Sequence, residues 1–210
     1  FFGTLKNVYN FFVLYANQDE INPREFFVDY KNRPELDRWI LSKYNRLIRE
    51  VTAEMDRYDH MKSVRKIQEF VSEDLSNWYI RLNRSRFYGG GDDPDKMLVY
   101  SRLYDILVGV CGLMAPFAPF FSDYVYRQLR GAATGQEPES IHLTSFPAFD
   151  AAKIEPQLEA EMALVQKLVS LALSARKRKN LKVRQPLARI LTHTEDGRTL
   201  SAEVAEVMLK

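Results

Sequence analysis

One stretch of the sequence combines the residue types that bind unstacked nucleobases. Asn77, Trp78, Arg81 and Arg84 follow one another between residues 76 and 86. On a helix, Asn77, Arg81 and Arg84 share one side, next to an apolar stripe that ends at Trp78. A planar ring stacks on a base, a guanidinium pairs with a phosphate or a base edge, and an amide reads an edge. The pattern is typical of a site for single-stranded RNA.

The same stretch also has a purely structural interpretation. Trp78 continues an apolar stripe and would then belong to the core, while the arginines would form ion pairs with Glu73 or Asp74. A charged helix face is often simply solvated. Both interpretations stay open at this point.

A second stretch, residues 176–186, concentrates positive charge without any acidic residue. Its six basic residues are Arg176, Lys177, Arg178, Lys179, Lys182 and Arg184. Cations suit the C-terminus of a helix, but four in a row repel one another more than that role requires. The run therefore favours phosphate binding. Consecutive cations point all round a helix end, which suits the nucleic-acid backbone better than base edges.

Other chemistry is missing from the sequence. The three histidines (His60, His142 and His193) match no metal-ligand spacing, and no phosphate-binding glycine loop is present. The lone cysteine, Cys111, excludes an internal disulfide and suits a reducing, cytosolic compartment. The sequence therefore predicts no catalytic residue, no metal site and no bound cofactor.

Composition restricts the possible partners. The chain has 210 residues, 46% of them hydrophobic, with 30 basic against 28 acidic residues. This balance excludes a disordered polyelectrolyte and a histone-like DNA-binding protein, so a nucleic-acid site must be a local patch. The longest uncharged run, 106–122, contains Pro116 and Pro119 and is too short for a membrane span. We expect neither a DNA nor a membrane partner.

Apolar residues recur at 3.6-residue spacing through most of the chain and predict an all-α fold. The expected helices are a first segment around residues 5–16, then 34–55, 59–87, 94–114, 120–129 and 154–179. In the first, Asn7, Asn10 and Asn17 form a polar face opposite the apolar one. Residues 18–33 and 131–153 are expected to be irregular. The tail predicts a strand at 188–194 and the start of a helix at 200–210.

Four ordered segments carry a resemblance to a known family. Residues 32–42, 74–87, 113–121 and 182–187 resemble isoleucyl-tRNA synthetases, class I aminoacyl-tRNA synthetases, in the version shared by eukaryotes and some bacteria. The resemblance covers the stretch that follows the catalytic core. It implies an anticodon-binding helical bundle over residues 1–187 and the truncated start of a small α/β C-terminal extension over 188–210. The absence of an initiator Met also suggests a piece of a longer protein.

The resemblance implies that the parent enzyme joins isoleucine to tRNA(Ile) in the cytoplasm, using ATP and Mg²⁺. The two ATP-site signatures of the family are missing, so this chain is expected to bind tRNA as a monomer and to catalyse nothing. In the family, the first helix of the bundle and the helix that carries the Trp contact the anticodon. Those positions correspond to Asn7, Asn10, Trp78, Arg81 and Arg84.

Three alternatives remain. The sister valyl- and leucyl-tRNA synthetases carry a similar domain. The residues of segments 78–84 and 182–187 are the main feature that favours the isoleucyl family over these two. A helical protein-interaction module would suit the modest net charge. A self-contained helical enzyme would need a catalytic constellation, which the sequence lacks.

Overall fold

The computed structural model describes residues 1–19, 33–88, 93–130, 138–187, 189, 191 and 200–207. The chain divides into two compact units, Phe1–Ile154 and Glu155–Lys210, and each is described by itself. The described residues form helices and connecting turns, which confirms the all-α prediction. The domain boundary expected at residue 187 concerns a longer enzyme and stays a prediction.

The first unit begins with α1 (Phe2–Gln18), where the apolar spacing predicts a helix. Its buried residues are Leu5, Val8, Phe12 and Ala16. The side chains of Asn7, Asn10 and Asn17 are exposed on the other face, as expected. This helix packs against η2 and α5, both described below.

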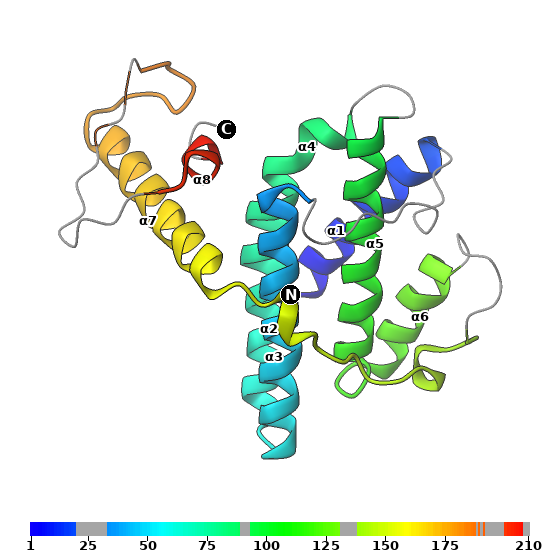
Figure 1. The fold of residues 1–210 in the computed structure, drawn as a ribbon. Coiled ribbons are helices and arrows are strands. Elements are labelled where there is room, and N and C mark those ends of the chain that lie inside the picture. The colour runs from blue at the N-terminus through cyan, green and yellow to red at the C-terminus, as the bar shows by residue number, and fades with distance from the viewer. Residues whose placement is uncertain are drawn as a thin grey trace. The chain divides into compact units, whose positions relative to one another are not determined.

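A long helical hairpin forms one side of the first unit. Helix α2 (Glu35–Asp56) runs beside a helical rod made of α3 (His60–Glu69) and η2 (Phe70–Ile80), from which α4 (Arg81–Phe87) continues directly (Figure 1). Tyr58 ends α2 in the left-handed conformation, with φ 59°. The backbone N–H groups of Tyr58 and Asp59 then donate to Met55 and Glu54, both at 2.9 Å, and satisfy the last carbonyls. The Asp59 side chain caps α3.

The middle of these three segments, η2, is π-helical, and this corrects the prediction of a single α-helix over 59–87. A π-helix holds more residues per turn than an α-helix. The buried positions accordingly step by four, through Val71, Leu75, Tyr79, Asn83 and Phe87. Trp78, at which the predicted apolar stripe ends, is only half-buried.

Helix α5 (Pro94–Met114) is the central helix of the first unit (Figure 1). Asp93 caps it and Pro94 occupies its first turn, as the sequence predicts. It is long and apolar enough to cross a membrane, but 78% of its apolar window is buried inside the protein, which accounts for its hydropathy. Prolines end it, and α6 (Pro119–Arg130) follows.

The described part of 131–153 is irregular, as expected, apart from two short 3₁₀ turns, η3 (Ile141–Leu143) and η4 (Ala151–Lys153). The prediction for 18–33 lies almost entirely outside the described residues.

The second unit consists of α7 (Pro156–Arg178) packed against α8 (Ala202–Val207), at the two helical positions that the sequence predicts. Most of the strand predicted over 188–194 lies outside the described residues. Of the residues that are described there, Arg189 and Leu191 have no regular secondary structure.

Candidate nucleic-acid interface

The RNA-binding stretch identified in the sequence spans the junction of η2 and α4. Arg81 and Arg84 are exposed, and Trp78 is half-buried at the edge of the core. Trp78 is therefore only partly a core residue, whereas Arg81 belongs to the surface. Within the part of the chain that the structure describes, neither arginine forms an ion pair with a carboxylate.

The carboxylates that the structural interpretation assigned to these arginines have other partners. Asp74 pairs with Lys43 of α2 at 3.1 Å. Glu73 accepts a hydrogen bond from the exposed Asn77 side chain, also at 3.1 Å. Arg81 and Arg84 therefore present their charge to solvent, where phosphates can reach them.

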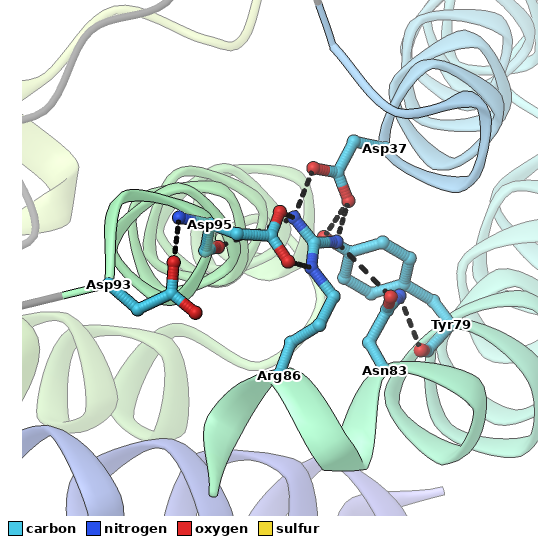
Figure 2. A network of polar contacts seen from close by, with 6 residues as sticks. All are labelled: Asp37, Tyr79, Asn83, Arg86, Asp93 and Asp95. Atoms are coloured by element: carbon cyan, nitrogen blue, oxygen red, sulfur yellow. Dashed lines mark hydrogen bonds and ion pairs between the residues drawn. The ribbon is translucent and has the colours of Figure 1, made fainter. Parts of the chain in front are cut away.

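The arginine that does form ion pairs on α4 is Arg86, on the inner side of the helix (Figure 2). Its Nη1 and Nη2 donate to the two carboxylate oxygens of Asp37 at 2.7 and 3.0 Å. Its Nε and Nη2 donate to the two oxygens of Asp95 at 2.8 and 2.6 Å. Asp37 lies on α2 and Asp95 on α5, so one guanidinium ties three helices together.

Tyr79 and Asn83 complete this cluster (Figure 2). The Tyr79 hydroxyl donates to Asp37 at 2.8 Å, and the Asn83 oxygen accepts from Arg86 at 3.1 Å. Burial, followed by the charge of Asp37, raises the pKa of Tyr79 well above its usual value. Burial alone would lower the pKa of Arg86, but hydrogen bonds and charge from Asp37, with Asp95, raise it. Arg86 therefore stays charged and holds α4 in a fixed rotation about its axis.

Aromatic contacts join α1 to α4. The rings of Phe11 and Phe87 meet edge to face with their centroids 4.9 Å apart. The rings of Tyr15 and Tyr88 do the same with their centroids 5.2 Å apart. Phe11 and Tyr15 flank the exposed face of α1 that carries Asn7. The α1 and α4 positions predicted to bind RNA thus lie on adjoining surfaces.

A large cavity of the first unit lies elsewhere. It has a volume of about 900 Å³ and is lined from α2, α5, α6 and residues 138–153, among them Asn45, Arg102 and Lys153. None of the residues predicted to bind RNA lines it. The candidate interface is an open surface, as a polymer ligand requires.

The second predicted patch lies at the end of α7, in the second unit. Lys177, Lys179, Lys182 and Arg184 are exposed. Asn180, with φ 54°, ends the helix in the left-handed conformation. The chain then turns back, with the Leu181 N–H donating to the Arg176 carbonyl at 2.9 Å.

Arg176 has a structural contact that the sequence did not indicate. Its Nη1 donates to the carbonyls of Lys182 and Gln185, both at 2.9 Å. This guanidinium fastens residues 182–185 to the helix end and so positions Lys182 and Arg184. The sequence predicts that Arg176 binds phosphate. The structure adds that the Arg176 side chain holds residues 182–185 in place.

Sequence reasoning missed Tyr15, Tyr88 and the Arg86 cluster. Arg86 lies in the same motif as Arg81 and Arg84, but its partner Asp37 is 49 residues away, so no local pattern announces the pair. Among the described residues, no group of three or more His, Cys, Asp or Glu side chains is placed to hold a metal ion.

Comparison of the chain with known proteins identifies its family. Residues 37–192 match the family model described as the anticodon-binding domain of tRNA ligase. The chain is 47% identical over 191 residues to the isoleucine–tRNA ligase of Porphyromonas gingivalis, covering 91% of this chain and 16% of that protein. Against the isoleucine–tRNA ligase of Bacteroides fragilis it is 45% identical, covering 93% of this chain and 17% of that protein.

A third relative, the isoleucine–tRNA ligase of Dehalococcoides mccartyi, is 44% identical over 98% of this chain and 20% of its own length. The chain thus spans about a fifth or less of the length of these relatives. The chain belongs to the family of anticodon-binding domains of tRNA ligases.

Proposed function

We propose that the chain binds the anticodon arm of tRNA(Ile) as one domain of an isoleucine–tRNA ligase. The observation that carries the proposal is the joined surface of α1 and α4, on which Arg81 and Arg84 are exposed beside half-buried Trp78. The three relatives named above are isoleucine–tRNA ligases, which supports isoleucine over the sister amino acids.

Trp78 and the two arginines divide the work of binding. Trp78 is anchored at the edge of the core and exposes part of its ring for stacking on an unpaired base. Arg81 and Arg84 supply cations for phosphates or base edges, and Asn7 and Asn10 add amides from α1. Each of these groups binds and orients RNA without making or breaking a covalent bond.

The basic segment 176–184 supplies a second, sequence-independent contact. Lys177, Lys179, Lys182 and Arg184 neutralise phosphates of the tRNA backbone, while Arg176 holds the segment in its turned-back course. Binding through phosphates weakens steeply as the salt concentration rises. Each phosphate contact releases counterions from the RNA, and that release becomes less favourable as the salt concentration of the solution increases.

In the parent enzyme, ATP-dependent joining of isoleucine to tRNA takes place in other domains. ATP and Mg²⁺ are assigned to those domains because the two ATP-site signature sequences are not in this chain. The parent acts as a monomer in the cytoplasm, and this chain supplies recognition.

Binding of three tRNA transcripts tests the assignment to isoleucine. At fixed, moderate salt, the chain should bind tRNA(Ile) more tightly than tRNA(Val) or tRNA(Leu). A preference for either of the other two would assign the chain to a sister ligase. Equal binding of all three would leave only attraction to phosphates.

A further inference from the structure

An exposed pair of tyrosines lies at the edge of the surface shared by α1 and α4. The side chain of Tyr88 is 54% exposed, and that of Tyr15 is partly exposed. Their rings meet edge to face with centroids 5.2 Å apart. An aromatic ring exposed to water gives up the stabilisation that its burial would provide. A pair of rings held together at the surface therefore suggests a role in binding.

The tyrosine pair packs on a series of further aromatic rings that hold it in place. Four rings pack in series. The ring centroids of Tyr15 and Phe11 are 5.0 Å apart, those of Phe11 and Phe87 are 4.9 Å apart, and those of Phe87 and Tyr100 are 5.0 Å apart. Phe87 and Tyr100 are 1% and 0% exposed, so the series of rings runs from the core to the surface. A ring that is already fixed loses little conformational entropy when a ligand stacks on it.

Positive charge adjoins the pair. Tyr88 follows Arg84 by one turn on the same face, and its backbone N–H donates to the Arg84 carbonyl at 3.3 Å. A hydrogen bond with Tyr88 raises the pKa of Tyr15, while the nearby charge of Arg84 acts to lower it. Both rings therefore lie within reach of an arginine.

We infer that Tyr15 and Tyr88 form a stacking platform for one unpaired base of the anticodon loop, beside Arg84, which neutralises the neighbouring phosphate. The inference rests on the proposed function and extends it. An aromatic face next to a cation is complementary to a nucleotide, whose base is planar and whose phosphate is anionic. Arg81, Arg84 and Tyr88 are also spaced i, i+3 and i+7, which places all three on one exposed face.

The test uses the 210-residue chain and a tRNA(Ile) anticodon stem-loop in which 2-aminopurine replaces one loop base at a time. Stacking on an aromatic ring quenches this base. Binding of the wild type and of Tyr88→Phe should quench the same loop position. Tyr88→Leu keeps an apolar side chain without a ring and should lose both the quenching and affinity, by about 5-fold to about 150-fold.

Tyr124→Ala is the matched control, because Tyr124 is an exposed tyrosine of the same unit on α6, 63% exposed. It should bind like the wild type. If Tyr88→Leu binds and quenches like the wild type, the rings only pack α1 against α4 and the inference is overturned.

The two proposals fail in different ways. If the wild type binds the stem-loop no better than one with a swapped anticodon, the proposed function fails and the platform falls with it. If the wild type discriminates but no loop position loses its quenching in Tyr88→Leu, the platform alone is wrong.

Discussion

Arg86 and Asp37 form a two-pronged ion pair across 49 residues of sequence, with N–O distances of 2.7 and 3.0 Å. Asp37 is 1% exposed, so its charge depends on this partner and on the Tyr79 hydroxyl. The pair fixes how α4 is rotated against α2. That rotation turns Arg86 inward and leaves Arg81 and Arg84 facing solvent.

Removing the Arg86 side chain should therefore destabilise the fold. Arg86→Ala leaves the buried Asp37 carboxylate without its cation, and we expect a loss of about 3–5 kcal/mol in the free energy of unfolding. Chemical denaturation measures this loss. Arg84→Ala, two residues earlier on the exposed side of the helix, is the matched control and should change stability by no more than about 0.5 kcal/mol. Equal effects of the two substitutions would contradict the structural role of Arg86.

Two glycine-to-alanine substitutions in helices should have opposite effects. At Gly109 a Cβ atom would collide with the Tyr44 hydroxyl oxygen and lie 2.5 Å from the ring carbon that bears it. The ring must move, so Gly109→Ala should cost about 1–3 kcal/mol. At Gly3 nothing lies within 4 Å of the added atom. Gly3→Ala should leave stability unchanged or raise it, because alanine favours the helix. A thermal melt of each variant decides, and a stabilised Gly109→Ala would show that α2 and α5 are not this close.

Alkaline pH should unfold the first unit. Burial raises the pKa of Cys111 to about 12, and it also raises the pKa of Tyr79 and of Tyr44. In the unfolded chain these groups lose their protons at lower pH, so the unfolded state binds fewer protons there and stability falls as pH rises. The free energy of unfolding should be nearly constant from about pH 7 to 8 and then decrease above the usual Cys and Tyr values of about 8.5 and 10. Denaturant titrations at increasing pH test this, and a flat profile up to about pH 11 would contradict the burial of these groups.

The basic segment should bind every tRNA alike. Replacing Lys177, Lys179 and Lys182 together by Gln should weaken cognate and non-cognate tRNA by similar factors and flatten the dependence of affinity on salt, because each lost phosphate contact lowers the slope by about 1. Binding isotherms at several salt concentrations give that slope. A loss confined to the cognate tRNA would show that the segment reads bases. Arg176→Gln removes one cation and also frees residues 182–185, so it is expected to weaken the binding of both tRNAs.

The sequence predicted the helices and the polar face of α1 well, because regular 3.6-residue spacing marks which side of a helix is buried. Asn7 and Asn10 are exposed for this reason. The same arithmetic was wrong after Leu75, where η2 adds residues to each turn and brings Tyr79 and Asn83 into the core. No propensity in residues 70–80 announces that change.

The candidate site was predictable where it is local and not where it depends on distant contacts. Trp78, Arg81 and Arg84 lie within about two helical turns, and their types and spacing are enough to raise the hypothesis of an RNA site. Tyr15 and Tyr88 meet only because α1 packs beside α4, so the sequence offered no reason to pair them. The pairing of Arg86 rather than Arg84 with a carboxylate likewise depends on tertiary packing.

The account's central claim is that the surface of α1 and α4 reads the anticodon. Its most direct test is the affinity of the chain and of Arg81→Ala for two tRNA(Ile) transcripts that differ only in the anticodon. The wild type should prefer the native anticodon. Arg81→Ala should lose most of that preference with its melting temperature nearly unchanged, because Arg81 is exposed and has no carboxylate partner among the described residues. Equal affinity of the wild type for both transcripts, or unfolding of Arg81→Ala, would contradict the claim.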